Sequence, residues 1–198
     1  MAWLHEFVEP KISVTDLAEK LSMAGFEVES IEDRSEFAAG VVTGFIETVE
    51  KHPNADKLSV CKVNVGKQDP LQIVCGAPNV RENIHVAVAL EGVFLPAKGI
   101  TIKQSSLRGV QSQGMICSLD ELGIKSSVEG ILVVEELNKP IPDLGNEISD
   151  LIELNDTILD LAITANRPDG MSIIGIAKEV SALTKCNFQQ VKDEIELQ

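Results

Sequence analysis

The chain has 198 residues, of which 44% are hydrophobic, and this suits one large globular domain or two small ones with a buried core. Its formal net charge is −14, and no apolar run approaches the length needed to span a bilayer, so no membrane association is expected. Four widely spaced cysteines without a CxxC pair, together with three scattered histidines, show no metal-binding cluster and indicate a reduced, cytoplasmic protein.

The first predicted element is a helix that begins at a capping pattern formed by Ser13 and Asp16. Gly25 is placed to end this helix, because a left-handed C-terminal residue costs glycine nothing. A half-exposed strand follows, in which Phe26 and Val28 alternate with glutamates. The apolar stripe of the helix consists of Leu17, Ala18, Leu21 and Ala24.

From Gly40 the hydrophobic period changes to two, and short strands separated by turn residues are predicted. Adjacent apolar residues at Val60 and Cys61 predict a β-bulge in the second strand. Five such strands fit a small barrel of the oligonucleotide-binding kind, although an open sandwich would satisfy the same pattern. The predicted strands are Val41–Val49, Leu58–Val65, Leu71–Cys75, His85–Leu90 and Gly99–Lys103. The acidic residues 119–150 are expected to wrap back over the barrel.

The last third of the chain returns to mixed α/β character. A strand is predicted over Leu159–Ile163, and the turn Asn166–Gly170 follows it, with Asp169 available to cap the next helix. That helix has its apolar stripe at Ile173, Ile176, Ala177, Val180 and Leu183. Because neither flank of the barrel can bury a core alone, we expect the two flanks to pack together as a discontinuous domain.

The predicted fold class is therefore α+β, with a five-stranded barrel of the oligonucleotide/oligosaccharide-binding (OB) type inserted into a small discontinuous α/β domain. The first half of that domain is expected at residues 1–39, the barrel at residues 40–150, and the second half at residues 151–198.

Charge is distributed unevenly over these segments. Residues 40–111 carry 8 basic and 6 acidic side chains and are the only segment with a basic balance. Because affinity for nucleic acids depends on Lys and Arg at the phosphates, the sequence predicts at most weak, salt-sensitive RNA binding. The chain has no Tyr, and the barrel region offers only Phe45 and Phe94, so contact through shape and backbone is favoured over base stacking.

Two segments carry a family resemblance. HPNADKL at His52–Leu58 and LRGVQSQGMICS at Leu107–Ser118 resemble the signature segments of the tRNA-binding OB-fold domain. The flanks, Trp3–Asp33 and Leu159–Thr184, resemble the two halves of the first domain of the bacterial-type phenylalanyl-tRNA synthetase β subunit, which that barrel interrupts. The motifs occur in the family's order over nearly the whole chain. The turn that usually reads TPNRPDC in the family departs from it here at Ala165 and Gly170.

The resemblance implies a non-catalytic, N-terminal part of this β subunit that binds tRNA and serves as a scaffold for phenylalanylation. The implied partners are tRNA and the α subunit of an α2β2 heterotetramer, and ATP and Mg would belong only to the parent ligase. The residues implied to face tRNA are Asn54, Lys57, Arg108, Ser112, Gln113 and Met115. The competing interpretation of these positions is a tight turn followed by a buried strand at Gly114–Cys117. Arg167 is expected to anchor its own turn or to bridge to a neighbouring domain.

Two other functions remain open from the sequence. A free-standing tRNA-binding or chaperone-like OB-fold protein would not need the two flanking segments. A structural insert without RNA affinity would be consistent with the acidic net charge.

Overall fold

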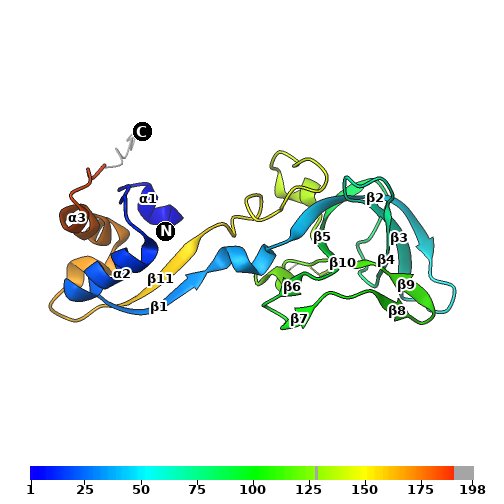
Figure 1. The fold of residues 1–198 in the computed structure, drawn as a ribbon, viewed down its shortest axis with the longest axis horizontal. Helices are drawn as coiled ribbons and strands as arrows, with labels where there is room; N and C mark the ends of the chain where they lie inside the picture. Colours follow the sequence, from blue (N-terminus) through cyan, green and yellow to red (C-terminus); the bar gives the residue numbers. More distant parts are fainter. Residues whose placement is uncertain (128, 190–198) are drawn as a thin grey trace, which may run out of the picture. The chain divides into compact units, whose positions relative to one another are not determined.

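The computed structural model describes residues 1–127 and 129–189, and the chain forms two compact units. One unit is Met1–Arg34 together with the segment that starts at Asp156, and the other is Ser35–Asn155 (Figure 1). The predicted boundaries lay at 39/40 and 150/151, inside the second unit. That unit extends further in both directions because Ala38 and Leu154 are buried in its core.

The second unit is built on a five-stranded antiparallel sheet that curls into a nearly closed barrel (Figure 1). The OB-type barrel and the α+β fold class are thus confirmed. The strands, in their order across the sheet, are β10 (Gly114–Ile116), β5 (Ile84–Leu90), β2 (Val41–Lys51), β3 (Ser59–Asn64) and β4 (Leu71–Cys75).

The prediction that Gly99–Lys103 forms a strand of the barrel was wrong. The segment Gly99–Lys103 contributes only β7 (Ile100–Thr101), which pairs with β6 (Phe94–Leu95) in a separate hairpin. Its Ile100 side chain is 42% exposed, whereas Ile116 of β10 is 5% exposed. The strand that completes the barrel is therefore the one that brings a buried side chain to the core, although it has only three residues.

The predicted bulge lies on the neighbouring strand. In β3 the pattern is regular, with Cys61 and Val63 fully buried on one face. The register shift occurs instead in β2, between Ile46 and Thr48. Since β2 pairs with β5 along its first half and with β3 along its second half, it is the strand that has to bend, and a bulge permits this.

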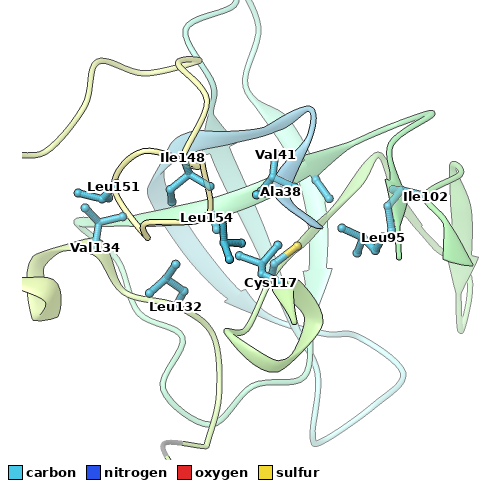
Figure 2. Packing of buried hydrophobic residues seen from close by; sticks show 13 residues of the cluster. Ala38, Val41, Leu95, Ile102, Cys117, Leu132, Val134, Ile148, Leu151 and Leu154 are labelled. Atoms are coloured by element: carbon cyan, nitrogen blue, oxygen red, sulfur yellow. The ribbon is translucent and has the colours of Figure 1, made fainter. Parts of the chain in front are cut away.

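One of the two apolar clusters of the barrel unit is completed by residues 119–155, which we call the closing segment (Figure 2). The closing segment contains the 3-10 turns η2 (Asp120–Leu122) and η3 (Val134–Leu137), and it forms one bridge to β5 through Val133. It therefore covers the barrel as expected. Its side chains in the cluster are Leu122, Leu132, Val134, Ile148, Leu151 and Leu154.

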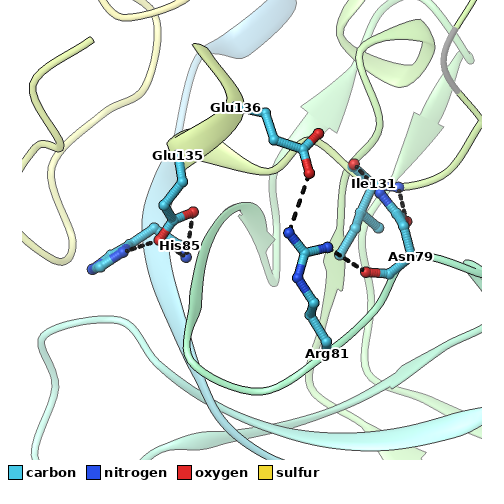
Figure 3. Close-up of polar contacts among 6 residues, drawn as sticks. All are labelled: Asn79, Arg81, His85, Ile131, Glu135 and Glu136. Atoms are coloured by element: carbon cyan, nitrogen blue, oxygen red, sulfur yellow. Dashed lines mark hydrogen bonds and ion pairs between the residues drawn. The ribbon is translucent and has the colours of Figure 1, made fainter. Parts of the chain in front are cut away.

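Polar contacts tie the closing segment to the loop before β5 and to β5 itself (Figure 3). The side-chain amide of Asn79 donates to the Ile131 carbonyl and accepts from the Ile131 N–H, both at 2.9 Å. The Glu135 carboxylate accepts from the His85 backbone N–H at 2.9 Å and lies 2.8 Å from its Nδ1. Burial alone would raise the pKa of Glu135, but these hydrogen bonds hold it below the usual value.

Within its described residues, up to position 189, the other unit packs three helices with a two-stranded antiparallel ribbon. The predicted cap is confirmed, because Ser13 Oγ accepts from Asp16 N at 3.0 Å. The predicted role of Asp169 as a cap is wrong, since Ser172 Oγ accepts the hydrogen bond from the first turn of the last helix. The elements of this unit are α1 (Ala2–His5), α2 (Val14–Met23), β1 (Glu27–Asp33), β11 (Thr157–Ala162), the 3-10 turn η4 (Pro168–Met171) and α3 (Ile173–Thr184). After β1 the chain continues into the barrel unit through the 3-10 turn η1 (Arg34–Ala38).

Arg167 forms an ion pair with Asp169 and anchors the turn before α3. Its guanidinium forms ion pairs with Asp169 at 3.0 Å and Glu179 at 2.8 Å and donates to the Ala24 carbonyl at 3.1 Å. It also lies 4.1 Å above the centre of the Phe26 ring. The hydrogen bonds from Arg167 lower the pKa of Asp169. Of the two predicted roles, the contacts within this unit support anchoring of the turn.

The fully buried Phe26 ring also accounts for glycine at position 170. A Cβ added to Gly170 would overlap Cε1 of Phe26 and lie 3.1 Å from Cδ1 of Ile163. A cysteine at this position would therefore not fit beside Phe26 without movement of the ring.

We expect Gly170→Ala to lower the free energy of unfolding by about 1–3 kcal/mol through overpacking against Phe26. Chemical denaturation of the variant measures this loss. The double variant with Phe26→Leu should be less destabilised than the sum of the two single changes, because the smaller side chain frees the space. Strict additivity would contradict the steric explanation.

Candidate nucleic-acid interface

The two signature segments, which are far apart in sequence, meet at one end of the barrel. The first is the loop between β2 and β3, residues 52–58, and the second begins in the hairpin of β8 (Ser105–Leu107) and β9 (Val110–Ser112). His52 Nε2 lies 2.9 Å from the Leu107 carbonyl oxygen, and Asn54 Nδ2 donates to the Arg108 carbonyl at 3.0 Å. In OB folds, the loops in these two topological positions are the ones that bind oligonucleotides.

The tip of the β8–β9 hairpin is a tight two-residue turn. Arg108 has φ +47° and Gly109 has φ +89°, so both central residues are left-handed. Such a turn matches the twist of the flanking strands, but a residue with a side chain adopts this backbone conformation at some cost. The turn presents the Arg108 side chain to solvent beside the loop 52–58.

His52 is only 5% exposed and uses both ring nitrogens. Nδ1 accepts a hydrogen bond from the backbone N–H of Asn54 at 3.0 Å. Because a carbonyl oxygen only accepts, the proton must be on Nε2, which donates to Leu107. The contacts therefore require the neutral tautomer with hydrogen on Nε2. No sequence pattern indicated this contact, because Leu107 lies 55 positions from His52.

Three of the predicted tRNA-facing residues lie exposed at this end of the barrel: Asn54, Lys57 and Arg108. Among the described residues, neither Lys57 nor Arg108 has a carboxylate within ion-pair distance. Their charges are thus available to a polyanion. Other exposed cations of the barrel unit include Lys51, Lys62 and Lys103.

Two other predicted residues complete the barrel. Ser112 is 3% exposed, and its Oγ accepts from Val74 N and donates to the Gly114 carbonyl, both at 3.0 Å. Gln113 donates its N–H to the Gln72 carbonyl at 2.9 Å, and its Oε1 accepts from Gln72 N at 2.8 Å. Strands β4 and β10 are the two edges of the sheet and are not paired with each other. The bonds of Ser112 and Gln113 to β4 stand in for part of the backbone hydrogen bonds that such pairing would form.

The sixth predicted residue, Met115, is half-buried against the core and lines a groove of about 680 Å³. The groove runs between the end of β4, the segment 101–107 and β10, and its lining mixes apolar and polar groups. Lys103 contributes a cation to it, while Glu121 and Glu129 contribute carboxylates. Such a lining favours contact with a base or a ribose edge over contact with several phosphates.

Exposed aromatic surface is scarce at this face. Phe45 packs against the His85 ring at a centroid distance of 4.9 Å, whereas Phe94 is 53% exposed. This surface offers few platforms for stacked bases.

Three of the cysteines are buried in the core, and their thiols are unreactive for that reason. Cys61, Cys75 and Cys117 are free and buried, and burial raises the pKa of Cys61 and Cys117 to about 12. A thiol that stays protonated at neutral pH is a poor nucleophile.

In residues 1–127 and 129–189 no group of three or more His, Cys, Asp or Glu side chains is arranged to hold a metal ion. No helix in the same ranges is long and apolar enough to cross a membrane.

Comparison with known proteins gives concordant matches. The family model described as "Putative tRNA binding domain" matches residues 41–140. The phenylalanine–tRNA ligase beta subunit of Prochlorococcus marinus (strain MIT 9313) is 59% identical over 189 residues, which cover 96% of this chain and 23% of the relative. The same subunit of Synechococcus sp. (strain CC9605) is 58% identical over 184 residues, which cover 93% and 23%. The chain thus spans about a quarter of the length of these relatives.

Among solved structures, the C-terminal domain of Plasmodium vivax p43 is 27% identical. The match covers 54% of this chain and 57% of that chain, with a TM-score of 0.38.

We expect Ser112→Ala to lower the free energy of unfolding by about 1–3 kcal/mol, because it leaves the Val74 N–H buried without a partner. Ser105→Ala is the matched control, since Ser105 pairs with Ser112 in the hairpin but is exposed. That control should change stability by less than about 0.5 kcal/mol. Equal denaturation midpoints for the two variants would contradict a role for Ser112 in barrel closure.

Proposed function

Because this chain belongs to the tRNA-binding domain family and is similar to phenylalanine–tRNA ligase beta subunits over nearly its whole length, we propose that it is a non-catalytic, tRNA-binding and scaffolding part of such a subunit. The similarity fits an N-terminal part of the subunit. The observation that carries the proposal is the junction of the two signature loops, where Lys57 and Arg108 stand exposed and unpaired within the described structure.

The proposed mechanism is recognition of the tRNA backbone and shape. Lys57 and Arg108 contact phosphates, and Met115 meets a base or sugar in the groove. Asn54 offers a ribose or phosphate oxygen the second N–H of its side-chain amide, since the first is donated to Arg108. Ser112 and Gln113 contribute by holding the barrel closed, since their polar atoms already bond to β4 or β10. With few cations and a net charge of −14, the binding is weak and falls with salt.

The names of the relatives suggest the wider assembly. We propose a cytoplasmic parent ligase in which this part belongs to a β chain that pairs with an α subunit as an α2β2 heterotetramer. ATP and Mg would act in that parent enzyme, and this part would need no cofactor. A structural insert without RNA affinity is the second candidate, and the acidic net charge favours it.

Titration of the chain with tRNA at several salt concentrations tests the proposal. We expect a dissociation constant that rises with salt, and Lys57→Glu combined with Arg108→Glu should abolish binding. The matched control reverses two exposed cations in other loops, Lys67 and Lys125, and has the same net charge. If the control loses as much affinity as the test variant, the site is wrong. If the unmodified chain shows no salt-dependent binding, the structural insert is the better description.

The size of the native polypeptide tests the parent assembly. An antibody raised against this chain should detect a band several-fold heavier than 21.4 kDa in the source cells, because the relatives are about four times longer. That band should co-purify with a second synthetase chain. A band near 21.4 kDa without a partner would instead support a free-standing tRNA-binding protein.

A further inference from the structure

We propose that His52 is a positioning residue that locks the loop 52–58 to the β8–β9 hairpin, so that cations on two separate loops meet one RNA backbone as a rigid pair. This inference rests on the proposed tRNA binding and adds to it the residue that organises the site.

The position of His52 suits it to join the two loops. Its backbone N–H donates to the Leu58 carbonyl at 3.1 Å and closes the base of the first loop. Its ring is buried, with one nitrogen accepting from a residue two positions later and the other donating to Leu107, 55 positions away. One side chain therefore fixes both the local turn and the distant hairpin.

A second contact joins the same two loops. Asn54 N donates to His52 Nδ1 within the first loop, and the Asn54 side chain independently reaches the Arg108 carbonyl at 3.0 Å. The carbonyls of both Leu107 and Arg108 thus accept hydrogen bonds from the first loop. These bonds stabilise a hairpin tip in which Arg108 holds an unfavourable left-handed backbone.

Preorganisation explains why this matters for binding. Lys57 and Arg108 are exposed and have no ion-pair partner among the described residues, so the hydrogen bonds between their loops help set the spacing of the two charges. A polyanion that meets two independently moving loops must order them on binding, which lowers affinity. Removal of the His52 contact to Leu107 should therefore weaken tRNA binding roughly tenfold, which corresponds to the loss of one well-placed hydrogen bond.

Two variants separate the distant contact from the local one. In His52→Gln the terminal amide can take the place of Nε2 and donate to Leu107, but the local acceptor is lost. In His52→Asn the amide oxygen takes the place of Nδ1 and accepts from Asn54 N as in an Asx-turn, but the side chain is too short for Leu107. We expect His52→Asn to lose roughly tenfold in tRNA affinity and His52→Gln to stay within about threefold of the unmodified chain.

The readouts are tRNA titration, thermal unfolding and the nitrogen-15 NMR signals of the His52 ring. The proposal expects hydrogen on Nε2 in the unmodified chain, and a ring protonated on Nδ1 instead would overturn it even if neither variant folded. Equal tRNA affinities for His52→Asn and the unmodified chain would also overturn it, while tRNA binding itself would stand. Absence of salt-dependent binding by the unmodified chain would instead count against the proposed function.

Discussion

The interface depends on how the barrel closes. A sheet with the order β10-β5-β2-β3-β4 leaves two edges, and these edges must be joined if the interior is to exclude water. The chain joins them largely with side chains, since Ser112 Oγ and Gln113 Oε1 accept from the backbone N–H groups of Val74 and Gln72 on the edge strand β4. Buried amides without partners would be costly, so this short stretch holds both the core and the adjacent β8–β9 hairpin in place.

The loops of the interface follow from that closure. Once β9 and β10 are held to β4, the carbonyls of Leu107 and Arg108 lie where the loop 52–58 can bond to them through His52 and Asn54. The result is a small region with exposed cations on a chain whose net charge is −14. Under the proposed function, local geometry and not overall charge would bring a phosphate backbone to this surface.

Local patterns predicted much of the fold. The Ser13 cap, the apolar stripes and most strands follow from interactions between residues a few positions apart, and the structure has them. The errors arose where partners are distant. The bulge lies on β2 because that strand pairs with β5 along its first half and with β3 along its second half. The strand β10, and not the segment 99–103, completes the barrel because it carries the buried Ile116. Asp169 does not cap α3 because that helix begins after Ser172, whose hydroxyl accepts from its first turn, while the Asp169 carboxylate pairs with Arg167.

By itself, the sequence determined the family, the barrel with its flanking halves and the two loops that carry the signature residues, because motif order and hydrophobic period are local properties of the chain. Only the tertiary structure decided what those residues do. It made Ser112 and Gln113 part of the barrel seam, left Lys57 and Arg108 exposed, and made His52 the link between the loops. The physical reason is that these hydrogen bonds join residues 38 to 55 positions apart, and no periodicity or turn preference encodes which distant group a buried polar atom will meet.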